Sequence, residues 1–300
     1  MTEGASDEQE PTTPEPPNRV LAVVLDSPLA GIAPWIVMSL FSGPGRFEVS
    51  VLAALALSLL FFVLGRRRGS SVKLMEVFDL IFFVGFAIIG ILASAATIAW
   101  LELWAGEITN IALTVFVVVT IIIRRPFTLG YAKETAEPWL WDNPVFLRIN
   151  YEISLVWAAV FGFQSIVGLY GDAVQHNSDN FWTGWTLQLA ATVFGVAFTE
   201  FWPEYASSKA QGEPLPSKRP LLEWIPVFFI ITGVAGLLTD SLGTLIAIVI
   251  IVVGAVAEVA LVRAQKAEAA RGGGRAATGG GAVGGGGAVG GAVGGDASRE

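Results

Sequence analysis

Long apolar runs alternate with short polar stretches along most of the chain, and this pattern predicts membrane-spanning helices. We distinguish eight such runs, of which the first is the shortest. They cover residues 29–42, 49–64, 78–101, 108–123, 151–169, 182–201, 221–238 and 242–262. At about 1.5 Å per residue, each run after the first approaches the roughly 30 Å hydrocarbon core of a bilayer. The sequence therefore predicts an all-α, polytopic transmembrane helical bundle of about eight spans.

The two ends of the chain lack this pattern. Residues 1–18 are acidic and rich in proline, and residues 266–300 are dominated by glycine and alanine. Neither composition buries enough apolar surface to offset the entropy lost on ordering. We expect disordered tails at 1–18 and 266–300, and one transmembrane helical domain at 19–265. The glycine clusters of the second tail follow no strand, so they do not indicate a nucleotide site.

Composition agrees with a location in the lipid bilayer. Hydrophobic residues make up 53% of the 300 residues and charged residues 15%, which is too apolar for one ordinary soluble core. Cysteine is absent, and the one histidine, His176, falls in a predicted loop. A metal site needs several convergent donors, so we expect a solvated His176, no metal and no cofactor. The chain also lacks the broad basic face that binds nucleic acid.

Basic residues follow every second apolar run. Clusters of arginine and lysine come after the second, fourth, sixth and eighth runs, whereas the opposite loops hold Arg46. This is the positive-inside pattern, and it places both termini in the cytoplasm of a bacterial plasma membrane. Acidic residues fall near the ends of the runs, where we expect them to reach water: Asp79, Glu102, Glu200 and Glu223.

Polar side chains recur at helical spacing on the fifth and sixth runs. One stripe holds Asn150, Ser154, Trp157, Phe161 and Gln164, and the other holds Gln188, Thr192, Gly195 and Thr199. Polar groups are disfavoured against lipid tails, so we expect the two stripes to face each other. They supply either hydrogen bonds between helices or a polar path for a solute. The candidate residues are Ser154, Gln164, Gln188, Thr192 and Thr199.

The longest polar interruption, residues 124–157, is dense in proline, tryptophan and paired charges. Asn143 and Pro144 predict a helix N-cap and first turn, and Arg148 can pair with Glu152 one turn later. We therefore expect a structured cytoplasmic platform at residues 126–144. Its candidate surface for binding other membrane proteins consists of Phe127, Tyr131, Trp141, Asp142, Arg148 and Asn150.

The residues of this interruption carry a family resemblance. RPFTLGYAKE at 125–134, WDNP at 141–144 and FLRIN at 146–150, with Trp157 beyond, resemble uncharacterised multi-pass membrane proteins of high-GC bacteria. More distantly, residues 30–170 resemble intracellular septation protein A, an inner-membrane protein associated with envelope synthesis and division. The resemblance implies a role in the cell envelope.

No motif of a known catalytic class is present. The sequence contains no nucleophile elbow, zinc-binding helix, P-loop or carboxylate pair at productive spacing, so we expect no enzymatic activity. The favoured function is a non-catalytic interaction or scaffold component of the envelope. The alternative is a channel or facilitator for a small solute.

Overall fold

The described part of the chain consists of helices joined by short loops. The structure, a computed structural model, describes residues 25–279 apart from 26, 42, 44 and 175–179. Within these residues no strand occurs. The chain forms two compact units, unit 1 (Met1–Trp224) and unit 2 (Ile225–Glu300). The predicted all-α class is confirmed.

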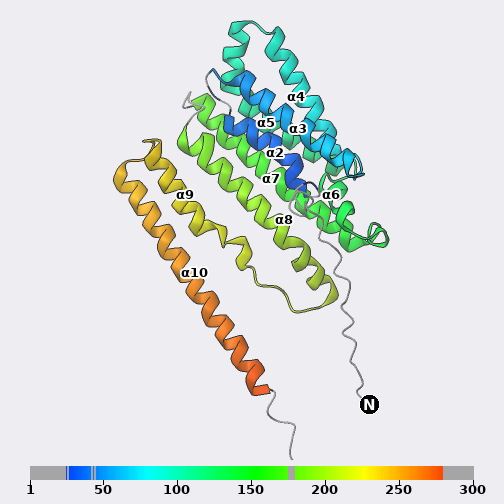
Figure 1. The fold of residues 1–300 in the computed structure, drawn as a ribbon, viewed down its shortest axis with the longest axis vertical. Helices are drawn as coiled ribbons and strands as arrows, with labels where there is room; N and C mark the ends of the chain where they lie inside the picture. The colour runs from blue at the N-terminus through cyan, green and yellow to red at the C-terminus, as the bar shows by residue number, and fades with distance from the viewer. Residues whose placement is uncertain (1–24, 26, 42, 44, 175–179, 280–300) are drawn as a thin grey trace, which may run out of the picture. The chain divides into compact units, whose positions relative to one another are not determined.

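In its described residues, unit 1 holds six long helices and several short ones. The helices α3 and α4 form one antiparallel pair, and α5, α7 and α8 pack side by side with α2 among them (Figure 1). The short α6 packs on α7. The bounds are α2 (Pro28–Phe41), α3 (Phe47–Arg67), α4 (Leu74–Leu92), α5 (Ala95–Ile122), α6 (Thr128–Thr135), η1 (Pro138–Leu140), α7 (Pro144–Val174), the π-helical η2 (Phe181–Thr186), α8 (Leu187–Gln211) and η3 (Arg219–Leu221).

Unit 2 is a hairpin of α9 (Trp224–Leu238), which begins at the last residue of unit 1, and α10 (Thr244–Gly279). Glycines let the two backbones approach closely. A Cβ atom on Gly254 would lie 2.7 Å from the carbonyl oxygen of Pro226, and one on Gly233 would lie 2.8 Å from that of Ala247. Small residues at such positions are typical of helices that associate in lipid.

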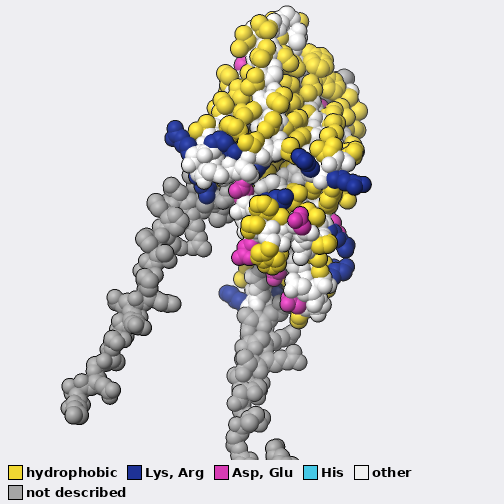
Figure 2. All heavy atoms as spheres, turned by 90° about the vertical axis from the view of Figure 1, so that its right-hand side faces the viewer, with side chains coloured by type: hydrophobic (Ala, Val, Ile, Leu, Met, Phe, Trp, Pro, Cys, Tyr) yellow, Lys and Arg dark blue, Asp and Glu magenta, His cyan; other side chains and the backbone are white. Residues whose placement is uncertain are grey.

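Seven helical stretches of the described chain are long and apolar enough to cross a membrane, one each in α3, α4, α5, α7, α8, α9 and α10. On the face that α3 and α4 present, apolar side chains form a continuous surface with lysine and arginine in a band beneath it (Figure 2). On α4, Ile81 and Ile91 are exposed apolar side chains. The chain is therefore an integral membrane protein.

The first predicted span, α2, has 14 residues, or about 21 Å of helix, which falls short of the hydrocarbon core. Instead of facing lipid along its length, it is buried among the other helices of unit 1. Ile32, Trp35 and Met38 are each at most 2% exposed. A helix enclosed by protein does not need the length of a lipid-exposed span.

The turn between the third and fourth runs was predicted at residues 102–107, and this is wrong. The chain turns at residues 93 and 94, where the Ser94 hydroxyl accepts a hydrogen bond from the Thr97 amide and caps α5. Trp100, Trp104 and Glu107 consequently lie within α5. The cap ends the third span earlier than average hydropathy indicates.

The predicted tail at 266–300 begins later than expected, because α10 continues to Gly279. An alanine-rich stretch after residue 263 favours helix, whereas our prediction followed the glycine clusters. The predictions for residues 1–18, for 280–300 and for His176 concern residues outside the described ones.

Candidate functional site

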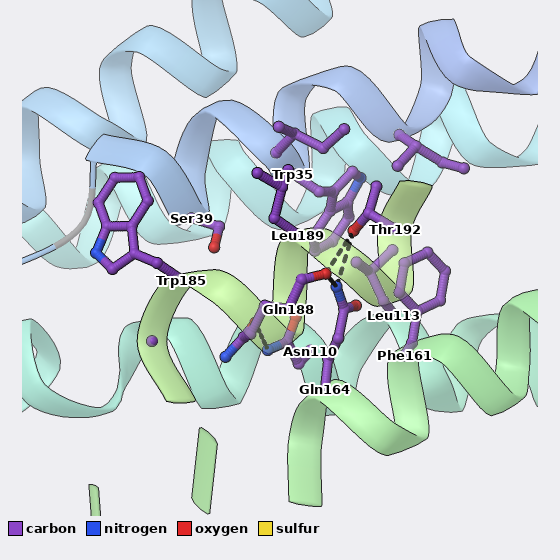
Figure 3. Close-up of a pocket in the computed structure, with 13 residues that line it drawn as sticks. Trp35, Ser39, Asn110, Leu113, Phe161, Gln164, Trp185, Gln188, Leu189 and Thr192 are labelled. Atoms are coloured by element: carbon purple, nitrogen blue, oxygen red, sulfur yellow. Dashed lines mark hydrogen bonds between the residues drawn. The ribbon is translucent and has the colours of Figure 1, made fainter. Parts of the chain in front are cut away.

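A buried network of side-chain amides and hydroxyls joins α5, α7 and α8 inside unit 1. The Gln164 Nε2 atom donates to the Gln188 carbonyl oxygen at 2.8 Å and to the Thr192 Oγ1 atom at 2.9 Å. From α5, the Asn110 Nδ2 atom donates to the Gln188 Oε1 atom at 3.0 Å. All four side chains are at most 9% exposed, and Figure 3 shows them converging.

The two polar stripes face each other as predicted. Below the amides, the Trp157 indole donates to the Thr199 hydroxyl at 2.9 Å, and a Cβ on Gly195 would lie 3.0 Å from the Trp157 ring. Ser154 is fully buried and lies 3.0 Å, oxygen to oxygen, from the Thr128 hydroxyl of α6. The stripes therefore fasten α7 to α8 and to the platform. Asn110 was missed, because it lies at the start of the predicted fourth run, 108–123, whereas the polar stripes were assigned to the fifth and sixth runs.

The amide network lines a small cavity of about 40 Å³. Trp35 and Ser39 of α2 and Trp185 of η2 complete its wall (Figure 3). A cavity holds a water molecule when it offers about 10–15 Å³ to the centre of a water-sized sphere. This volume fits a few waters or one very small solute.

Two carboxylates lie inside spanning helices of unit 1, which corrects the prediction that Asp79 reaches water. Asp79 on α4 is 2% exposed, and its Oδ1 atom accepts a hydrogen bond from the Trp35 Nε1 atom at 2.6 Å. Trp35 is held by contacts with the rings of three phenylalanines of α4, Phe78, Phe82 and Phe83. The partner that covers Asp79 is thus 44 residues away in sequence.

The second buried carboxylate, Glu107 on α5, was assigned by the sequence to a loop and is 3% exposed. Its carboxylate packs against Gly168 of α7, where any Cβ atom would overlap it. Glycine at this position lets a charged side chain approach the backbone of α7. Ser94, read as an N-cap, would have placed Glu107 within a helix.

Tyr131 of α6 inserts its ring into unit 1 and is 1% exposed. Its hydroxyl lies against Gly31 of α2, where a Cβ atom would overlap it, and no hydrogen-bond partner for it occurs within the described structure. Burial raises the pKa of this phenol well above its usual value, and the nearby carboxylates of Asp79 and Glu76 raise it further. The hydroxyl is therefore neutral at all physiological pH values.

An ionic cluster of Arg66, Lys73, Glu76 and Glu134 ties the α3–α4 turn to α6. The Lys73 Nζ atom lies 3.6 Å from a Glu76 oxygen and 3.8 Å from a Glu134 oxygen, and its side chain is 1% exposed. Arg66 pairs with Glu76 at 3.3 Å. Glu134 also accepts hydrogen bonds from the Ser71 amide at 2.8 Å and hydroxyl at 2.6 Å. The loops after α3 and α5 thus lie at one end of unit 1, which we call the basic end.

The pKa of Glu134 reflects opposing effects. Burial of the carboxyl raises the pKa, but the two Ser71 hydrogen bonds and the charges of Lys73 and Arg66 outweigh it. The net pKa is lower than the usual value for glutamate. The ionised form of Glu134 is therefore the one that holds α6 against the α3–α4 turn.

Three of the six residues predicted to present a partner surface are buried, which corrects that prediction. Phe127, Tyr131 and Asn150 are at most 3% exposed and hold the platform to the bundle from beneath. The platform folds back onto the bundle, so Phe127 and Tyr131 are enclosed. Asp142 and Arg148 are exposed, and Trp141 is partly exposed beneath Lys133, whose Nζ atom lies 5.0 Å from the ring centroid.

The start of α7 forms as predicted. The Asn143 side-chain oxygen accepts a hydrogen bond from the Val145 amide at 2.8 Å, which is the expected capping contact. The Arg148 Nε atom donates to Glu152 at 2.8 Å, and the Trp202 indole of α8 donates to the other Glu152 oxygen at 2.7 Å. The C-terminal half of α8 therefore lies at the basic end as well.

A groove of about 690 Å³ opens at the basic end between the platform, the start of α7 and the end of α8. Its lining carries no charged side chain. Trp139, on η1, is 72% exposed, whereas Ile149 and Ile153 form a buried floor. The sequence prediction missed Trp139, although its neighbour Trp141 was included. The remaining lining residues are Ala132, Thr135, Ala136, Leu140, Asn143, Val145, Phe146, Asn150, Pro203, Ser207, Ala210 and Gln211.

Taken together, these features define the class: a polytopic α-helical membrane protein with a polar interior and a folded platform at its basic end. Among the described residues, no group of three or more histidine, cysteine, aspartate or glutamate side chains could hold a metal ion. No protein-family model, curated protein or solved structure matches the chain. Any more specific role is argued from geometry.

Proposed function

We propose that this protein is a non-catalytic component of the bacterial cell envelope that binds another membrane protein in the groove at its basic end. The observation that carries the proposal is the groove itself, with its exposed Trp139 and uncharged lining. An exposed tryptophan beside an apolar floor is typical of the residues that dominate binding energy. The resemblance to intracellular septation protein A supports an envelope role.

The lining of the groove indicates the chemistry of the partner. Ile149, Ile153 and Phe146 suit apolar side chains, and Thr135, Ser207 and Gln211 supply neutral hydrogen-bonding groups. An apolar helix that emerges from the bilayer fits this combination, as in other helix-in-groove complexes. An acidic or basic peptide does not, because the groove would bury its charges without counter-charges.

The proposal places the basic end in the cytoplasm. The arginines and lysines of the loops after α3 and α5 support this, because positively charged loops stay on the cytoplasmic side. Thr135 is exposed on the platform and suits a labelling test, since the chain contains no cysteine. A Thr135→Cys variant should resist a membrane-impermeant thiol reagent in intact cells and react after lysis. Labelling in intact cells would refute the orientation.

In-cell crosslinking tests the docking function. A photo-crosslinking amino acid at position 139 should capture one membrane protein reproducibly, and the same substitution at Trp100 should not. Trp100 is a matched control, because it is 53% exposed but lies on α5 within a spanning helix. Phe146→Ala should abolish capture from position 139. If positions 139 and 100 capture the same proteins, the groove is no specific site.

A second candidate function is a facilitator for a small solute. The convergence of Asn110, Gln164, Gln188 and Thr192 on one cavity favours it, because amides at membrane depth can replace the hydration of a neutral solute. The double variant Gln164→Leu and Gln188→Leu should stop solute uptake into reconstituted vesicles. Unchanged uptake would eliminate this candidate.

A further inference from the structure

The two buried carboxylates of unit 1 have no part in the docking function. Asp79 and Glu107 lie on neighbouring spans, α4 and α5, and each is at most 3% exposed. A carboxylate in the membrane interior is costly, and such residues characteristically mark routes for ions or protons. Helix packing in lipid is achieved by small residues and by neutral hydroxyl or amide side chains, without a carboxylate.

Neither carboxylate lines the cavity, but each is linked to a residue that does. Glu107 precedes Asn110 by three residues, so both lie on one face of α5, and Asn110 lines the cavity. On another wall Trp35 lines the cavity while its indole nitrogen donates to Asp79. The cavity therefore has two lining residues that are linked to carboxylates. Asn110 shares a face of α5 with Glu107, and Trp35 donates a hydrogen bond to Asp79.

Further ionisable side chains lie between Asp79 and the basic end of unit 1. Glu76 lies one turn before Asp79 on α4 and belongs to the ionic cluster, where Lys73 and Arg66 face it. The charge of Asp79 is one of the causes of the raised pKa of the buried Tyr131 on α6. Asp79 therefore leads to charged groups at the water-exposed end of the bundle.

We propose that unit 1 conducts protons across the membrane through Glu107, water in the cavity and Asp79. A proton adds to a Glu107 oxygen from the end opposite the basic end. That O–H bond breaks as a chain of waters that reaches past Asn110 into the cavity takes the proton, and the same chain passes a proton past Trp35 to Asp79. Asp79 releases it toward Glu76. Both carboxylates return to their starting charge, and one proton moves down its electrochemical gradient without another reactant.

The geometry favours a proton over a metal cation. A cation requires several oxygen ligands around one point, and no acidic cluster of that kind occurs in the described residues. A proton needs one acceptor at each step and a water between them. The cavity of about 40 Å³ has room for such water. The inference does not rest on the docking function, and it shares its cavity with the facilitator.

The test is proton flux into liposomes that contain the purified full-length protein. A potassium diffusion potential drives the flux, and a trapped pH-sensitive dye reports it. Wild-type liposomes should acidify at least tenfold faster than protein-free ones. Glu107→Gln and Asp79→Asn should each slow this flux at least tenfold. Glu102→Gln, a matched control on α5 at a partly exposed position, should leave it unchanged.

Two results would overturn the proposal: wild-type flux no faster than that of protein-free liposomes, or undiminished flux in both carboxylate variants. Asp79→Asn keeps an oxygen for the Trp35 hydrogen bond, and size-exclusion elution checks that each variant folds. A second measurement is independent of transport. Infrared difference spectra between two pH values should show a carboxylic acid band that Glu107→Gln removes, and a spectrum without this band would also refute the proposal.

The facilitator and the proton route are distinguished by the same variants. Gln164→Leu with Gln188→Leu removes the amides that a neutral solute requires. Glu107→Gln removes a proton acceptor and leaves the amides in place. Solute uptake that survives Glu107→Gln while proton flux is lost supports the proton route and shows that solute uptake does not depend on it. Solute uptake that is lost in the amide double variant, together with undiminished proton flux in both carboxylate variants, supports the facilitator and overturns the proton route.

Discussion

Unit 1 and unit 2 consist of the same kind of apolar helix, yet different contacts hold them together. In unit 2, α9 and α10 meet through Gly233, Gly254 and Ala247, and among its described residues Thr232 is the buried polar side chain. In unit 1, buried amides, hydroxyls and carboxylates occupy the helix interfaces. Helices in lipid gain little from hydrophobic burial against each other, so both solutions rely on close packing or hydrogen bonds.

The difference indicates where function resides. In unit 2 the helices associate through glycine contacts and do not rely on polar side chains buried between them. Helices of this composition therefore do not need polar interfaces for stability. Unit 1 nevertheless retains Asp79 and Glu107 inside its spans. Groups that are expensive to bury and unnecessary for packing are best explained by a chemical role. The following predictions test this division between the units.

The largest effect is expected from Lys73→Met. Lys73 is 1% exposed at its side chain and neutralises both Glu76 and Glu134. Its loss leaves two partly buried carboxylates facing each other with Arg66 alone, which should lower the free energy of unfolding by about 3 kcal/mol. Denaturant unfolding of the purified protein in detergent measures this. Lys209→Met, at an exposed position on α8, should change stability by less than about 0.5 kcal/mol. Equal stability of both variants would contradict the role of the cluster.

An effect of about 2 kcal/mol is expected from Gly254→Ala in unit 2. The new Cβ atom would lie 2.7 Å from the Pro226 carbonyl oxygen and 3.0 Å from the Ile230 amide nitrogen, so the two backbones must separate. Gly243→Ala is the control, because a Cβ atom there meets nothing within 4 Å. The same unfolding measurement should show destabilisation for position 254 alone. A neutral Gly254→Ala would show that close backbone approach does not hold the hairpin together.

Gln164→Leu should destabilise unit 1 by about 1 kcal/mol, because hydrogen bonds between membrane helices are individually modest. The variant loses the bonds to the Gln188 carbonyl and the Thr192 hydroxyl. A double-mutant cycle with Thr192→Val isolates the second bond, and the double variant should lose less stability than the sum of the two single ones. Additive losses would mean that the two side chains do not interact.

Periodicity and charge predicted much of the fold, because they depend on neighbouring residues. The stripes on α7 and α8, the Asn143 cap and the Arg148–Glu152 pair are all local patterns, and the structure confirms them. The turn at residues 93 and 94 was missed, because a two-residue break capped by Ser94 barely lowers the average hydropathy around it. Polar Glu102 and Glu107 provided a more conspicuous and misleading boundary.

The candidate site was less predictable, because burial depends on distant partners. Asp79 is covered by Trp35 from another helix, and no local pattern links the two. Phe127 and Tyr131 were assigned to the surface, but α6 folds back so that both face the bundle. An eight-residue helix gives no sequence signal for which of its faces is enclosed. The groove could not be foreseen either, because its walls come from residues 132–153 and 203–211.

The smallest effect concerns the pH dependence of the ionic cluster. Glu134 has a pKa below its usual value, so its ionised form contributes stability that is fully present above the usual pKa of glutamate. This contribution is lost as the pH falls through the lowered pKa. Glu134→Gln should therefore be less stable than wild type at neutral pH, and the difference should shrink as the solution is acidified.

Unfolding curves at several pH values measure this difference in stability, with Glu137→Gln at an exposed position as the control. A difference that grows on acidification would reverse the sign of the linkage and show that burial outweighs the Ser71 hydrogen bonds. The hairpin of unit 2 lacks such a cluster among its described residues, so Gly254→Ala should cost the same at every pH.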